Sequence, residues 1–123
     1  MKVGAHMYDY NYNIKVSKIK GGHGYVEGTI GNKRWFAIVQ EDTVDYAINP
    51  NTLEKGDGRV TRLCIYEEDT SFDGNPYLPS MTVKRHIFVN FQHSWSVLNT
   101  QHVAMVRDLI HYLEMRTSLR VLK

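Results

Sequence analysis

One segment with a helical period, residues 99–120, limits what this chain can fold into, because the apolar residues before it alternate as they do in strands. Apolar side chains recur within it at helical spacing and form a stripe that needs a core: Val103, Val106, Leu109, Ile110 and Leu113. Asn99 is placed to cap the first turn, and Leu98 to pack against Val103. The segment therefore predicts one C-terminal helix packed on a sheet.

The same predicted helix carries a second apolar set on another face, which consists of Met105, Tyr112, Met115 and Leu119. A chain of 123 residues is expected to form one domain with one core, so this set has no second core to enter. The second set therefore predicts contact with a partner chain.

Stretches with apolar residues at alternate positions predict about five strands, at residues 12–19, 25–30, 33–39, 59–66 and 81–91. Gly31-Asn32 predicts a two-residue hairpin turn between the second and third stretches. In the fourth, Leu63 and Ile65 are the expected core residues, and in the fifth a bulge is expected near Arg85.

The glycine-rich segment 21–24 predicts a tight turn, since it lacks the lysine and the following helix of a phosphate-binding loop. The chain is thus predicted to be a single α+β domain, residues 1–123. An antiparallel sheet of about five strands, over residues 12–91, is followed by a helical segment at residues 99–120 that packs on it.

Two segments rich in carboxylates and turn residues, 40–58 and 67–79, are predicted to be loops. Neither has the aspartate spacing that a calcium-binding loop requires, so both are expected to be solvated. As loops, they would offer acidic side chains to a basic protein partner.

The formal net charge is +2, and it is unevenly distributed along the chain. Residues 1–39 carry six basic and two acidic side chains, residues 40–79 carry three and nine, and residues 80–123 carry six and two. The central acidic block argues against a uniformly basic face for long nucleic acid, whereas a few arginines can still hold a compact anion.

No arrangement of catalytic or metal-binding residues stands out. The six histidines lack a paired spacing, and Cys64 is a lone cysteine in an apolar strand pattern, so neither a zinc site nor a disulfide is predicted. No serine, threonine or cysteine has the sequence context of a nucleophile. We therefore expect a binding protein without enzyme activity, metal or cofactor, in a reducing cytoplasm.

The apolar runs are too short to cross a membrane, and no secretion sequence follows the first lysine, so no membrane partner is expected. The start of the chain, with Gly4-Ala5-His6-Met7, resembles a cloning remnant. Residues 1–6 are therefore expected to precede a native start at Met7.

Six residues are candidates for a ligand site: Arg116, Arg120, Arg62, Phe88, Asn90 and Asn99. The two arginines of the predicted helix are one turn apart and can meet one phosphate, or they can interact with the helix C-terminus. The arginine of the fourth strand can pair with an acidic loop or reach the ligand. The phenylalanine can stack on a base or cover a neighbouring strand, and the asparagines can bind a base or ribose edge.

Three segments combine a hairpin with a further strand: GYVEGTIGNKRWFAIV at residues 24–39, YAIN at residues 46–49 and GRVTRLCI at residues 58–65. Together with the order of sheet then helix, this pattern resembles the phage Thoeris anti-defence protein 1 family. The resemblance implies a homo-oligomer, a dimer or a hexamer, that sequesters a cyclic ADP-ribose isomer without cleaving it. Some members of that family also hold cyclic oligonucleotides.

The resemblance further implies a phage protein that acts in the cytoplasm of the host bacterium, where it evades antiviral immunity. The alternative function is that of a phage accessory or inhibitor protein, which would bind a host protein through the two acidic segments.

Overall fold

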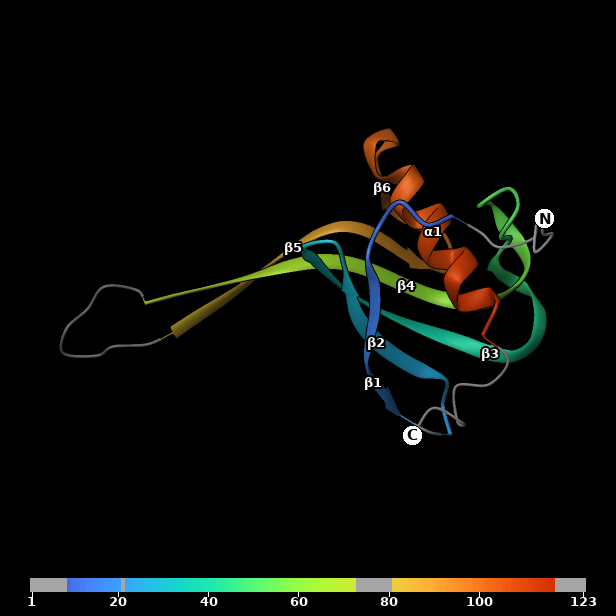
Figure 1. Ribbon diagram of the computed structural model, residues 1–123, viewed down its shortest axis with the longest axis horizontal. Helices are drawn as coiled ribbons and strands as arrows, with labels where there is room; N and C mark the ends of the chain where they lie inside the picture. The colour runs from blue at the N-terminus through green and yellow to red at the C-terminus, as the bar shows by residue number, and fades with distance from the viewer. Residues whose placement is uncertain (1–8, 21, 73–80, 117–123) are drawn as a thin grey trace, which may run out of the picture.

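The computed structural model describes residues 9–20, 22–72 and 81–116. They form a six-stranded antiparallel sheet, in which each strand pairs with the next along the chain, and a helical segment (Figure 1). The elements are β1 (Ile14–Lys20), β2 (Tyr25–Ile30), β3 (Lys33–Ile48), β4 (Lys55–Phe72), β5 (Met81–Gln92), β6 (Trp95–Leu98), η1 (Thr100–His102) and α1 (Val103–Glu114). The predicted α+β class is confirmed. The sheet has one strand more than predicted, because residues 95–98 pair with β5.

Two rows of side chains cross the sheet on the face that α1 covers. One row consists of Val16, Gly28, Trp35, Ile65, Val89 and Leu98, and the other of Ile19, Val26, Ala37, Leu63, Phe91 and Trp95. The buried apolar residues of α1 join the same cluster: Met105, Val106, Leu109, Ile110 and Leu113. The predicted core positions Leu63 and Ile65 are fully buried. The core therefore lies between one sheet face and one helix.

Helix α1 is shorter than predicted. Asn99 precedes a single 3-10 turn and makes no side-chain capping bond, so the α-helix itself begins at Val103. At the other end, Nη1 of Arg59 in β4 donates to the carbonyl oxygens of Glu114 (2.9 Å) and Arg116 (2.7 Å). This guanidinium satisfies carbonyl groups near the helix end, and so favours termination at Glu114.

This helix end corrects the predicted position of Arg116. Arg116 follows α1 instead of standing within it, and Arg120 lies outside the described residues. Among the helices of residues 9–20, 22–72 and 81–116, none is long and apolar enough to cross a membrane.

Residues 10 and 11, ahead of β1, contact α1. The Tyr10 ring centroid lies 5.9 Å from that of Tyr112, and the backbone N–H of Asn11 donates to Oδ2 of Asp108 (2.8 Å). The chain itself therefore occupies part of the helix surface that was assigned to a partner.

The second apolar set of α1 is divided between the core and the surface. Met105 belongs to the core cluster and Tyr112 packs against it, whereas Met115 is exposed. Leu119 lies outside the described residues. Two of the four residues that predicted a partner chain thus have contacts within this chain.

The first predicted acidic loop is wrong for most of its length. β3 continues to Ile48 and β4 starts at Lys55, so the connection is only residues 49–54. The β3–β4 register shifts three times between Ile38 and Ala47. The polar residues of this segment therefore belong to irregular strand pairing and not to a loop. A strand with carboxylates at its exposed positions resembles a loop in composition, which explains why the sequence predicted a loop here.

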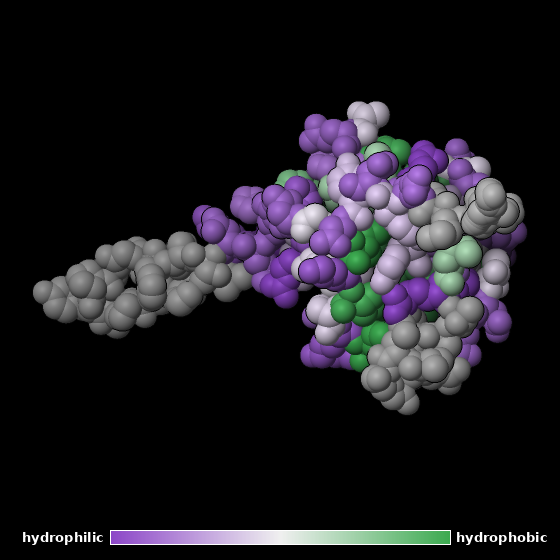
Figure 2. Space-filling model, viewed as in Figure 1, coloured by the Kyte–Doolittle hydropathy of each residue, from purple (hydrophilic) through white to green (hydrophobic). Residues whose placement is uncertain are grey.

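The second predicted loop is strand as far as Phe72, and the rest of it, residues 73–79, lies outside the described residues. Here β4 and β5 continue beyond the sheet as a two-stranded arm, defined as residues 67–72 and 81–86 (Figure 1). The β3 partners of β4 end at Tyr66, and the β6 partners of β5 begin at Val89. In the same view, side chains at the base of the arm are mostly hydrophilic (Figure 2).

Gly28 fixes the spacing between the first three strands. An ideal Cβ at this position would overlap the carbonyl oxygen of Lys15 and lie 2.9 Å from Cζ2 of Trp35. The Trp35 indole crosses this site and donates from Nε1 to the carbonyl oxygen of Thr29 (2.9 Å). Only a residue without a side chain leaves room for the fully buried tryptophan.

We expect Gly28→Ala to lower the free energy of unfolding by about 1–3 kcal/mol, because the added methyl overpacks the core. Urea denaturation of the purified variant measures this change. Gly56→Ala is the matched control, since a Cβ there would meet its nearest atom, Cβ of Asn49, at 3.7 Å. Equal stability of the two variants would contradict the packing around Trp35.

Candidate ligand-binding face

The sheet face opposite α1 has no helix over it in the part of the chain that the structure describes. The strand pairing sorts its side chains into three rows, each starting at a lysine of β1. The rows are Lys15, Thr29, Arg34, Tyr66 and Ile87; Lys18, Glu27, Phe36, Cys64 and Asn90; and Lys20, Tyr25, Ile38, Arg62 and Gln92. We call this surface the open face.

Three aromatic rings cross the open face on neighbouring strands. Tyr25 and Phe36 are stacked with centroids 6.0 Å apart, and Phe36 and Tyr66 are tilted at the same separation. A row of π-faces on a sheet can stack with the bases of a nucleotide ligand.

Cationic side chains lie over each ring of this row. The Arg62 guanidinium carbon is 5.0 Å from the Phe36 centroid, that of Arg85 is 4.2 Å from Tyr66, and Nζ of Lys20 is 5.2 Å from Tyr25. These distances are those of cation–π contacts. The open face therefore combines aromatic rings with positive charge, with Tyr66 buried and Tyr25 and Phe36 partly exposed.

Arg62 is held in place by the strands beneath it. Its Nη1 donates to Oδ1 of Asn90 (2.7 Å) and to the carbonyl oxygens of Leu63 and Phe91 (both 3.1 Å). Asn90 in turn donates from Nδ2 to Oγ of Ser96 (2.7 Å). All described hydrogen bonds of Arg62 leave from Nη1, so Nε and Nη2 are free to donate to a ligand anion.

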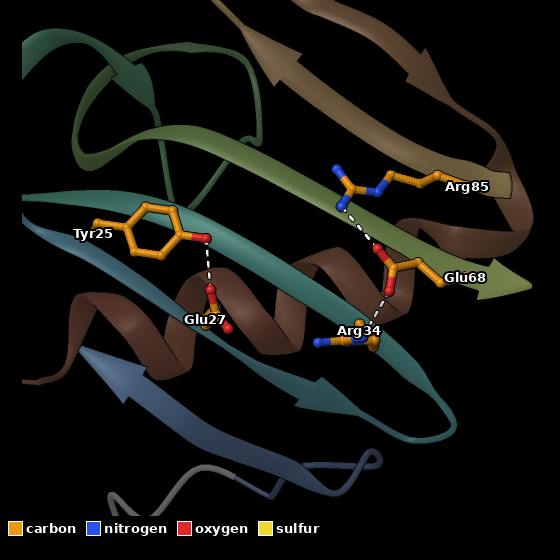
Figure 3. A network of polar contacts seen from close by, with 5 residues as sticks. All are labelled: Tyr25, Glu27, Arg34, Glu68 and Arg85. Carbon is orange, nitrogen blue, oxygen red and sulfur yellow. Dashed lines mark hydrogen bonds and ion pairs between the residues drawn. The ribbon is translucent and has the colours of Figure 1, made fainter. Parts of the chain in front are cut away.

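Glu68 bridges two arginines at the base of the arm (Figure 3). Its Oε1 accepts from Nη1 of Arg34 (2.8 Å) and its Oε2 from Nη2 of Arg85 (2.9 Å). The hydrogen bond from Arg85, followed by the charge of Arg34, lowers the pKa of Glu68, and the same bond raises the pKa of Arg85. Two guanidinium groups thus converge on one carboxylate, which is the arrangement that also suits a phosphate.

Tyr25 donates from its hydroxyl to Oε1 of Glu27 (2.7 Å), and Figure 3 shows this pair with the Glu68 bridge on one side of the strands, with α1 behind. Partial burial, then the hydrogen bond to Glu27, raises the pKa of Tyr25 to about 12. The phenol therefore stays protonated at neutral pH and acts as a donor.

Cys64 lies in the middle row of the open face and is 2% exposed. Burial raises the pKa of its thiol against the opposing charges of Arg62 and Arg85. A buried, protonated thiol is a poor nucleophile, so Cys64 serves as a small apolar residue.

The structure brings two of the six predicted site residues together, Arg62 and Asn90, and both lie on the open face. Asn99 is exposed and accepts, at its backbone carbonyl, a hydrogen bond from the N–H of His102 (2.9 Å) in η1. Arg116 lies over the Tyr112 ring, 5.2 Å from its centroid, and donates from Nη1 to the Tyr112 hydroxyl (2.5 Å). Arg120 lies outside the described residues.

Phe88 lies on the helix side of the sheet, whereas strict alternation along residues 81–91 predicts it on the polar face with Asn90, so that prediction is wrong. The β4–β5 register shifts so that Ile65 faces Val89 and Tyr66 faces Ile87, which leaves Phe88 as the extra residue. Its ring packs against the core, 5.4 Å from His102 and 4.6 Å from Nζ of Lys33. The expected bulge exists, but at Phe88 instead of Arg85.

Sequence reasoning missed the aromatic row and its cations: Tyr25, Phe36, Tyr66, Arg34 and Arg85. The hairpin turn after Ile30 was sufficient to place Tyr25 opposite Ile38 and Glu27 opposite Phe36, because a two-residue turn fixes the register. The register of β4 was not accessible, since it depends on the irregular β3–β4 pairing.

No cluster of three or more metal-ligating side chains occurs among the described residues. Comparisons of the chain with protein-family models, with curated proteins and with solved structures find no match.

We expect Arg85→Gln to raise the titration midpoint of the Glu68 carboxyl toward the ordinary glutamate value. The stabilising contribution of a carboxyl with a lowered pKa is present above its unfolded-state pKa and is lost as pH falls through the folded value. NMR titration of the side-chain carboxyl carbon measures the midpoint. Arg34→Gln should raise it less, and an unchanged midpoint in Arg85→Gln would contradict the bridge.

Proposed function

We propose that this protein binds a small nucleotide of the cyclic ADP-ribose or cyclic-oligonucleotide type on its open face and holds it without cleaving it. The main support is the geometry around Arg62, whose guanidinium is fixed by Asn90 and the backbone while it lies over Phe36. An arginine ordered before binding loses less side-chain entropy when it meets a phosphate. Tyr25 beside Phe36 offers further aromatic surface to a base, whereas Tyr66 is buried.

The choice of ligand rests on the resemblance to the Thoeris anti-defence protein 1 family. On that basis we propose a phage protein that acts as a homo-oligomeric sponge for an immune signal in the cytoplasm of the host bacterium. The helix side of the sheet contributes less to this proposal than the sequence predicted, because Arg116 is engaged by Tyr112.

The alternative, recognition of a host protein by two acidic loops, has less support from the described contacts. Glu67, Glu68 and Asp69 of the arm lie opposite His86, Arg85 and Lys84, so basic partners accompany these carboxylates. A surface with alternating charge is not complementary to a uniformly basic partner.

Titration calorimetry with cyclic ADP-ribose isomers and cyclic oligonucleotides tests the proposal. We expect one of these ligands to bind, and Arg62→Gln to weaken its binding about tenfold or more, since a charged hydrogen bond is lost. The bound ligand, released by heating, should have an unchanged mass.

Arg107→Gln is the control, because Arg107 is exposed on α1, on the opposite side of the sheet. Equal binding by wild type and both variants would remove the open face as the site. A ligand of altered mass would instead identify an enzyme.

A further inference from the structure

The open face carries an excess of basic side chains that is not evident from the order of residues in the sequence. The three rows and the adjoining Glu68–Arg85 pair contain six basic side chains, Lys15, Lys18, Lys20, Arg34, Arg62 and Arg85, against two acidic ones, Glu27 and Glu68. Counting charge along blocks of the chain argued against a basic face, but neighbouring residues of a strand point to opposite faces. The block count therefore does not describe the surface.

Two carboxylates of the chain, Glu67 and Glu114, are engaged away from the open face. Glu67 forms an ion pair with Lys33 (3.6 Å), and Lys33 also contacts the helix-side residue Phe88. The Glu114 carboxylate of α1 accepts from the backbone N–H of Arg59 (2.6 Å). These two carboxylates therefore do not neutralise the cations of the open face.

An irregularity in β1 brings its three lysines to one face. The β1–β2 register shifts between Val16 and Lys18, so Ser17 is the extra residue. In a regular strand, Lys15 would share its face with residues 17 and 19, and Lys18 and Lys20 would point to the core. The bulge moves both lysines to the side of Lys15 and leaves Ile19 on the core side.

We propose that the open face binds a linear single-stranded nucleic acid, an inference that rests on this face being a nucleotide site. Bases stack on Tyr25 and Phe36, and the sugar–phosphate chain passes the lysines of β1 and the arginines of β3–β5. The centroids of Tyr25 and Phe36 lie 6.0 Å apart on neighbouring strands, which offers two ring faces to successive bases, with the buried Tyr66 beside them.

Three observations favour a single strand over other polyanions. The aromatic rings of the open face can stack only with unpaired bases, which a duplex keeps inside its own stack. An acidic peptide would use the cations but leave the aromatic row without a stacking partner. A mononucleotide carries too few phosphates to use cations on four strands.

Fluorescence anisotropy with labelled oligothymidylates of two, four and eight nucleotides tests the inference. We expect affinity to rise with length, and Lys15→Gln with Lys18→Gln to reduce the slope of log affinity against log salt by about 1.4, at about 0.7 for each phosphate contact on a single strand. Phe36→Leu should weaken binding of the longest strand about fivefold or more, because a stacking face is lost.

Lys55→Gln with Arg107→Gln is the matched control, since it removes the same charge outside the three rows. Equal effects of the two double variants, equal binding of a duplex, or full competition by polyglutamate would each overturn the inference. Binding of a small cyclic nucleotide without any oligothymidylate binding would overturn it and leave the proposed function intact. Failure of both kinds of ligand to bind would reject both proposals.

Discussion

A single helix covers a single face of this sheet, and the rest of the structure follows from that constraint. The two core rows bury their side chains against α1, with Trp35 fitted over Gly28. The opposite face has no such cover within the described residues, so its aromatic rings are shielded by long cationic side chains instead. The stems of lysine and arginine cover apolar surface while their charged ends stay in water. Stability and ligand recognition therefore draw on the same side chains.

The regular parts of the fold were predictable from local patterns. The alternation around Leu63 and Ile65 and the turn at Gly31-Asn32 identified strands and a hairpin, since both depend on neighbours in the sequence. The boundaries of α1 were not predictable, because Arg59 of β4 supplies the hydrogen bonds at its C-terminal end. Composition also led to a wrong prediction of loops where carboxylates occupy exposed positions of β3 and β4.

The candidate site was less predictable than the fold, because it depends on register. One extra residue at Ser17 turns two lysines to the open face, and one at Phe88 turns an aromatic ring away from it. Both bulges reverse an assignment that strict alternation would make. Arg62 and Asn90, both candidates from the sequence, lie on one face because β4 and β5 pair regularly between them.

The account depends most directly on which face of the sheet meets a ligand. Amide chemical-shift mapping of the labelled protein, during addition of the tightest nucleotide ligand, decides between the two faces. We predict that the largest changes follow Tyr25, Phe36, Arg62 and their row neighbours, with α1 little affected. Changes centred on α1 and Arg116, with the three rows unperturbed, would contradict the open face as the binding surface.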